Sequence, residues 1–136
     1  MVHAGLSQLR RAFQHQRQPG FAQPQGRNLL LFYAVECGLK ASWLTRNRLR
    51  DTSRIEQSLL REHGHDLLYW AKKLYLPAAV TTGRSSFRLR GSEGRLGVES
   101  AHQAWRYGVD LEPGDEAALE NWLEQVWQWA RGDLGL

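Results

Sequence analysis

The chain has 136 residues, of which 42% are hydrophobic and 24% are charged, and its formal net charge is +4 at pH 7. These values suit a single globular domain, 1–136, and exclude an intrinsically disordered chain. The longest apolar run, Leu29–Val35, is too short to cross a bilayer, and the N-terminus lacks the pattern of a signal peptide. We therefore expect no membrane segment. A lone cysteine, Cys37, cannot form an internal disulfide, which favours a cytoplasmic protein.

The first half of the chain predicts two helices, because apolar residues recur there at helical spacing. An N-terminal helix is expected over residues 4–15, and a loop containing two prolines and two glycines follows it. Residues 27–46 then form the most apolar segment, for which Asn28 is a candidate N-cap. A helix that is apolar on nearly every side belongs in the middle of a bundle, so we expect this one to form the core.

The second half predicts further helices around one irregular segment. A short helix is expected to end at Gly64, and another is expected over residues 65–76, before Pro77. Residues 78–98 hold four glycines and four arginines, which indicates a basic loop or a small hairpin. A helix or turn over 99–107 precedes a final helix over 113–131. Together these elements predict an all-α, up-and-down bundle of four to five helices.

Two groups of polar residues near the core helices could carry chemistry. Glu36 and Lys40 are four residues apart and share one face of an apolar helix, either as an ion pair that fixes helix register or as an acid/base pair. We favour the ion pair. His65 and Asp66 are expected to open the next helix and lock it onto its neighbour through hydrogen bonds. Without a cysteine pair or an HExxH motif, the sequence predicts neither a metal site nor a cofactor.

The positive charge is carried by fifteen arginines and only three lysines. Guanidinium groups match phosphate and carboxylate geometry, so arginine clusters are candidate contacts with nucleic acid or an acidic partner protein. The segment Trp105-Arg106-Tyr107 could stack on bases and hold a phosphate, or Arg106 could tie two helices together. The candidate binding residues are Arg46, Arg48, Arg50, Arg54, Arg84, Arg88, Arg90, Arg95, Trp105, Arg106 and Tyr107.

Three motifs resemble those of prokaryotic HEPN-domain proteins. Residues 33–41, YAVECGLKA, resemble that family's YAVECALKA helix, with Gly38 where the family prefers alanine. Residues 64–67, GHDL, resemble the start of its next long helix, and residues 105–107 resemble its W…RY segment. The order and rough spacing match from about residue 26 to residue 131.

The resemblance implies a bundle of four or five helices that often dimerises. Many members of the family are ribonucleases in toxin–antitoxin, CRISPR-linked or phage-defence systems. Others are inactive and bind nucleotides, RNA or a partner protein, frequently a nucleotidyltransferase. The active members carry an arginine and, a few positions later, a histidine on one helix, and two protomers face these motifs across the dimer.

In this chain the corresponding pair would be Arg95 and His102, but Gly97 and Val98 between them make a poor helix. We therefore predict a non-catalytic or weakly catalytic module of a defence or toxin–antitoxin-type system. It would form a homodimer or dock on a protein from a neighbouring gene, and its ligand would be RNA, DNA or a partner protein. One alternative is a metal-independent ribonuclease, in which His102 acts as acid or base and Arg95 steadies the phosphate. A second alternative is a purely structural subunit of a larger complex.

Overall fold

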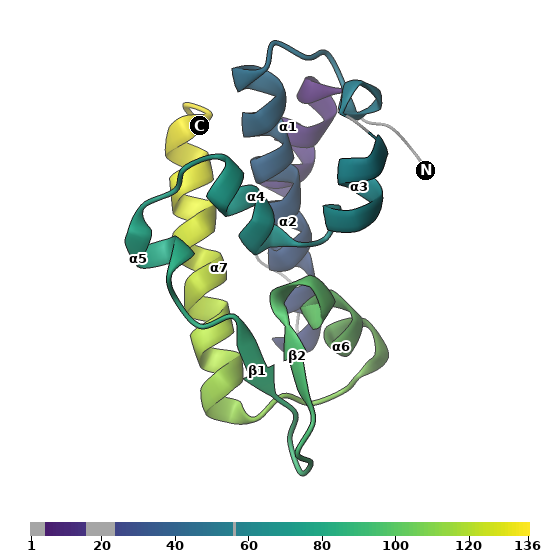
Figure 1. The fold of residues 1–136 in the computed structure, drawn as a ribbon, viewed down its shortest axis with the longest axis vertical. Helices are drawn as coiled ribbons and strands as arrows, with labels where there is room; N and C mark the ends of the chain where they lie inside the picture. Colours follow the sequence, from purple (N-terminus) through teal and green to yellow (C-terminus); the bar gives the residue numbers. More distant parts are fainter. Residues whose placement is uncertain (1–4, 16–23, 56) are drawn as a thin grey trace.

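The computed structural model describes residues 5–15, 24–55 and 57–136. In these ranges the chain is mostly helical and carries one small two-stranded sheet (Figure 1). The elements in chain order are α1 (Leu6–His15), α2 (Pro24–Arg46), a 3-10 turn (Thr52–Arg54), α3 (Gln57–His63), α4 (Leu67–Lys73), α5 (Ala78–Thr81), β1 (Ser86–Arg88), β2 (Arg95–Gly97), a second 3-10 turn (Val98–Ser100), α6 (Ala101–Tyr107) and α7 (Pro113–Asp133).

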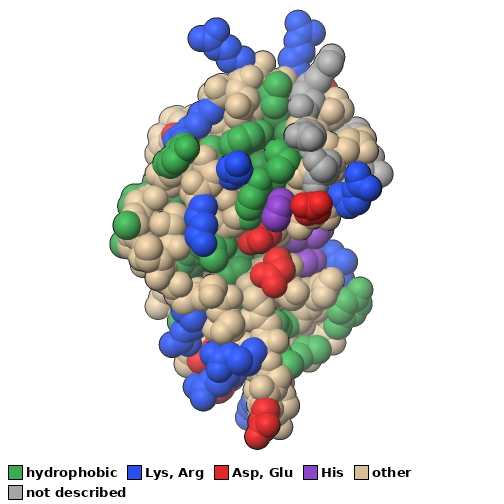
Figure 2. All heavy atoms as spheres, in the orientation of Figure 1, with side chains coloured by type: hydrophobic (Ala, Val, Ile, Leu, Met, Phe, Trp, Pro, Cys, Tyr) green, Lys and Arg blue, Asp and Glu red, His purple; other side chains and the backbone are tan. Residues whose placement is uncertain are grey.

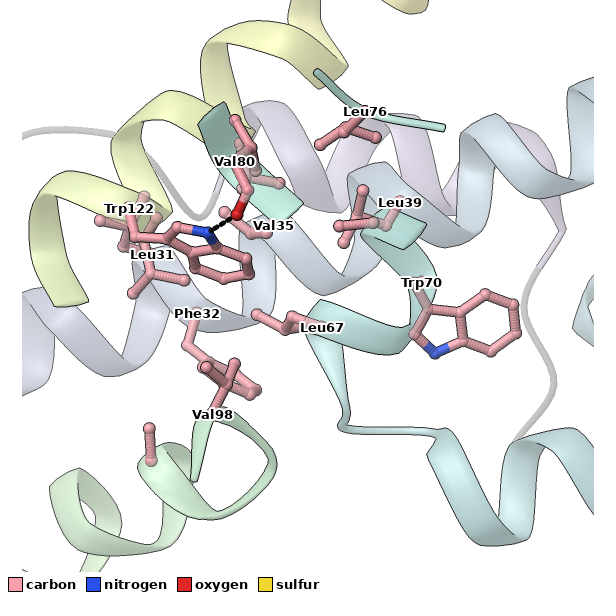
Figure 3. Packing of buried hydrophobic residues seen from close by; sticks show 14 of the residues in the cluster. Leu31, Phe32, Val35, Leu39, Leu67, Trp70, Leu76, Val80, Val98 and Trp122 are labelled. Atoms are coloured by element: carbon pink, nitrogen blue, oxygen red, sulfur yellow. Dashed lines mark hydrogen bonds between the residues drawn. The ribbon is translucent and has the colours of Figure 1, made fainter. Parts of the chain in front are cut away.

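The long helix α2 lies in the centre of the bundle, as its apolar sequence predicts. It packs against α1, α4, α6 and α7, which together cover its sides. In Figure 3, Leu31, Val35 and Leu39 of α2 lie among apolar side chains from α4, α5 and α7. Each large side chain buried in this way contributes about 1.5–3 kcal/mol of hydrophobic free energy. None of the described helices is long and apolar enough to cross a membrane.

The start of α2 differs from the prediction. The helix begins at Pro24, which suits a first turn, so Asn28 lies one turn inside the helix and does not cap it. Asn28 is buried, and its Nδ2 donates a hydrogen bond of 2.6 Å to Glu120 Oε1 on α7. This polar residue therefore joins two helices that are far apart in the sequence.

The α3–α4 corner follows the sequence closely. Helix α3 ends at His63, and a Cβ on Gly64 would lie 2.5 Å from the carbonyl oxygen of Leu60, so only glycine fits. Asp66 is the N-cap of α4, and its side chain accepts the Tyr69 N–H at 3.1 Å. The helix ends at Lys73, three residues earlier than predicted.

Residues 78–98 contain the small hairpin that their composition indicates. Strands β1 and β2 pair antiparallel, with Phe87 opposite Leu96. The segment that leads into α7 lies beside β1, because Arg90 N–H donates to Asp110 O at 3.0 Å and Glu112 N–H donates to Arg88 O at 2.9 Å. The hairpin is therefore fixed to the start of α7.

Helix α1 packs very closely against α2 at Gly38. A Cβ at this position would lie 2.7 Å from Phe13 Cδ1 and 3.1 Å from Ala130 Cβ. Phe13 is itself 1% exposed, and its ring stacks on Trp127 at 5.2 Å between ring centres. Glycine at position 38 thus allows three helices to meet.

Candidate functional site

The first candidate site is a group of titratable side chains that we call the histidine cluster: Tyr33, Glu36, Lys40, His65, His102 and Arg106. Tyr33, Glu36 and Lys40 are spaced by three and four residues and share one face of α2. Glu36 Oε1 accepts a 2.6 Å hydrogen bond from His65 Nδ1, and Glu36 Oε2 lies 3.7 Å from Lys40 Nζ. The side chains of Glu36 and Lys40 are only 13% and 14% exposed. The predicted ion pair and the contact from His65 are both present.

His102 lies beneath this pair, on α6. It is 4% exposed, and its ring centre is 4.4 Å from that of His65 and 5.2 Å from that of Phe32. Its Nδ1 is buried and has no hydrogen-bond partner with good geometry among the described residues. Burial and the nearby His65 lower the pKa of His102, against opposing effects of Glu36 and the Glu99 backbone. The imidazole is therefore neutral near pH 7.

In the segment predicted to contact bases, Trp105 is buried whereas Arg106 and Tyr107 are exposed. Arg106 donates a hydrogen bond to the Tyr33 hydroxyl, and its guanidinium lies 5.8 Å from the centre of that ring. Trp105 is buried, and its Nε1 donates to Glu116 Oε2 at 3.2 Å, so it ties α6 to α7 and offers no free ring face. Only Tyr107, which is 71% exposed, presents its ring to solvent.

The second candidate site is the hairpin end of the molecule. Here the buried carboxylate of Asp115, at the start of α7, accepts hydrogen bonds from Arg88 N–H at 2.7 Å and from Arg84 Nη1 at 2.8 Å. Arg88 Nε lies 3.5 Å from the same carboxylate. These contacts, the Arg88 N–H first, lower the pKa of Asp115. The two arginine side chains nevertheless remain 51% and 57% exposed.

Arg90 and Arg95 lie on the same hairpin, and we call Arg84, Arg88, Arg90 and Arg95 the hairpin arginines. Both are exposed, and Arg95 Nε donates to Ser86 Oγ at 3.2 Å across the two strands. Tyr107 lies three residues before Asp110, whose carbonyl accepts the backbone N–H of Arg90. Figure 2 shows Lys and Arg side chains gathered over this lower part of the molecule, whereas the histidines lie at mid-height beside acidic side chains.

The other predicted arginine cluster is divided. Arg46 is committed to the protein, because Nη1 donates to Leu74 O at 2.6 Å and Nη2 to Asp133 Oδ1 at 3.2 Å. Arg48 and Arg50 are exposed. The side chain of Arg54 lies outside the described part of the chain.

Sequence reasoning missed two contributors to these sites. Tyr33 belongs to the YAVECGLKA motif, and its position three residues before Glu36 was the available signal. Asp115 lies in the first turn of α7, and nothing in the sequence connects it with arginines 27 and 31 residues away. Of the proposed pair, Arg95 Nε donates to Ser86 Oγ on the hairpin, while the buried His102 ring lies against Phe32 of α2 and His65.

Neither site resembles a metal or thiol centre. Within the described residues, no three His, Cys, Asp or Glu side chains are placed to hold a metal ion. Burial, and next the neighbouring Glu36, raise the pKa of the Cys37 thiol to about 11, so it stays protonated. Comparison with models of protein families, with curated proteins and with solved structures finds no match to this chain.

Proposed function

We propose that this chain is a HEPN-like helical module that binds single-stranded RNA through its hairpin end and does not cleave it. The observation that carries the proposal is that Arg84 and Arg88 are both fixed by the buried Asp115 while remaining more than half exposed. The three sequence motifs and the mostly helical fold support the HEPN-like part of the proposal.

Arg84 and Arg88 are suited to phosphate because Asp115 already sets the geometry of their side chains. A guanidinium has five N–H donors, and Asp115 uses only some of them on Arg84 and Arg88. Side chains that are held before binding lose less rotamer entropy when a ligand arrives. The exposed ring of Tyr107 adds a surface on which a base can stack. Phosphate pairing and stacking together are the usual means of binding single strands.

The same structure argues against the ribonuclease alternative. A general acid or base must come within hydrogen-bond distance of the ribose hydroxyl that it serves. His102 is 4% exposed, so RNA cannot reach its ring while α6 stays packed on α2. Arg95 lies on the hairpin, where it would bind phosphate without helping His102.

The wider setting of the proposal comes from the family resemblance. The module would form a homodimer, or a complex with a protein from a neighbouring gene, in a defence or toxin–antitoxin-type system. Size-exclusion chromatography with light scattering, with and without RNA, measures the mass of the assembly. A monomeric mass at every protein concentration would leave the hetero-complex as the arrangement to test.

The test of RNA binding is a titration of a labelled single-stranded oligouridylate at several salt concentrations, followed by fluorescence anisotropy. Arg90→Gln/Arg95→Gln should raise the Kd about tenfold, because two phosphate contacts are lost. The slope of log K against the logarithm of the salt concentration should become less steep by about 1.4. The control is Arg61→Gln/Arg131→Gln, which removes the same charge from exposed positions on α3 and at the end of α7.

The control should bind nearly as well as the wild type. An equal loss in both variants would mean that binding follows net charge alone and that the hairpin is not the site. If the wild type cuts the RNA and His102→Ala does not, the module is a ribonuclease. Absence of binding at every salt concentration would favour the structural subunit.

A further inference from the structure

Four helices in the described part of the chain end in the same way. At the ends of α2, α4, α6 and α7, one residue adopts a left-handed conformation, and the next N–H bonds back to the carbonyl five residues earlier. These hydrogen bonds are Leu49 N–H to Leu44 O at 2.8 Å, Leu76 N–H to Ala71 O at 3.0 Å, Val109 N–H to Ala104 O at 2.8 Å and Leu136 N–H to Arg131 O at 2.9 Å. Since the motif is shared, its left-handed positions can be compared directly.

The left-handed residue differs among the four ends. In α6 and α7 it is Gly108 and Gly135, with φ of 72° and 71°. In α2 and α4 it is Arg48 and Tyr75, with φ of 55° and 57°. Residues with a Cβ are strained in this conformation, and a bulky residue such as tyrosine is an outlier there. The chain therefore carries side chains at two positions where its own other helices use glycine.

Packing does not explain the tyrosine. Its side chain is 87% exposed, the highest value among the exposed large hydrophobic residues, so little burial offsets the strain of Tyr75. Arg48 is exposed as well. A side chain that destabilises the backbone and contacts little of its own protein is free to serve a ligand.

Arg48 and Tyr75 lie at the same end of the molecule. Arg46 joins the two helix ends, because its guanidinium donates to the carbonyl of Leu74, the residue before Tyr75. Lys72 and Lys73, in the last turn of α4, are also exposed. We call Arg48, Lys72, Lys73 and Tyr75 the Tyr75 surface. In Figure 1 these ends of α2 and α4 point away from the hairpin, toward the end that holds the C-terminus.

We infer that the Tyr75 surface is a second site for single-stranded nucleic acid. A base stacks on Tyr75, while Arg48 and Lys72 pair with phosphates. Tyr75 offers an exposed ring, and the exposed Lys72 and Lys73 precede it by three and two residues. Single strands are bound by exposed aromatic rings together with nearby cations.

The inference rests on the proposed RNA binding. It adds that one protein chain binds two separate segments of an RNA strand. The test is the stoichiometry of binding, measured by isothermal titration calorimetry with an oligouridylate of about six nucleotides, which is too short to occupy both ends. The wild type should bind two molecules per chain. Arg48→Gly/Tyr75→Gly should bind one, with the hairpin affinity unchanged, and Tyr75→Trp should still bind two.

The variant is designed so that unfolding cannot explain a loss of binding. Because glycine relieves the strain at both positions, Arg48→Gly/Tyr75→Gly should melt at the same temperature as the wild type or higher. A wild-type stoichiometry of one, abolished by Arg90→Gln/Arg95→Gln, would overturn the second site and leave the proposed function standing. No binding by any form would overturn both. If Arg48→Gly/Tyr75→Gly loses binding to polyglutamate but still binds two oligonucleotides, the Tyr75 surface binds an acidic protein and the inference is wrong.

Discussion

The histidine cluster and the hairpin end are both organised around one carboxylate, yet they differ in where the remaining donors point. Glu36 gathers Lys40, which is 14% exposed, and His65, which is 53% exposed. Asp115 gathers Arg84 and Arg88, which are 51% and 57% exposed. The first cluster buries its Glu36–Lys40 pair and joins helices, whereas the second leaves both of its guanidinium groups to solvent. The exposure of the cation, not the residue type, distinguishes the two clusters.

The largest expected effect comes from breaking the inward arrangement. Glu36→Ala removes the acceptor of both His65 and Lys40, and it leaves a mostly buried ammonium without its carboxylate. We expect a loss of about 2 kcal/mol in the free energy of unfolding, measured by urea denaturation. RNA binding measured on the folded variant should be unchanged, because the hairpin is not involved.

A second variant shows whether this cluster is structural. Glu36→Met/Lys40→Met replaces both charges with apolar groups of similar length, which can pack at positions that are about 13% exposed. This double variant should recover most of the stability lost in Glu36→Ala. A variant that stays as unstable as Glu36→Ala would indicate that the charges themselves are needed there.

A smaller effect is expected from the hairpin. Asp115→Asn weakens the anchors of Arg84 and Arg88, so RNA affinity and stability should both decrease, the latter less than in Glu36→Ala because both arginines are already solvated. The lowered pKa of Asp115 sets the pH window. Its stabilising contribution is present above its ordinary pKa of 3.8 and disappears as pH falls through the lower folded value. Thermal unfolding from neutral to acidic pH should show wild type and variant converging only in acid.

The smallest effect concerns His102. Its pKa is lower in the folded protein than the ordinary 6.5, so the unfolded chain takes up a proton first as the pH falls. The contribution of His102 to stability is therefore present above its ordinary pKa of 6.5 and declines as the pH falls toward the lower folded value. His102→Phe should flatten this decline as the pH falls through 6.5, measured by urea denaturation at each pH. An unchanged slope would place the pH dependence on other groups.

Much of the fold could be read from the sequence, because it depends on local signals. The apolar periodicity of α2, the spacing of Glu36 and Lys40, and the Gly/Arg-rich hairpin segment all act over a few residues. The errors are long-range. The partner of Asn28 lies 92 residues away on α7. Likewise, whether Trp105 or Tyr107 faces solvent depends on which helices cover α6. Tyr75 gave no signal, since a left-handed residue without glycine has no sequence marker.

The contact of Gly38 with Phe13 has an evolutionary consequence. Because the ring of Phe13 occupies the space of a missing methyl group, the two positions share one fixed volume. Homologous chains with alanine at the position of Gly38 should carry a smaller side chain opposite it, or a displaced first helix. The two sites are therefore expected to change together in an alignment, as a compensating pair.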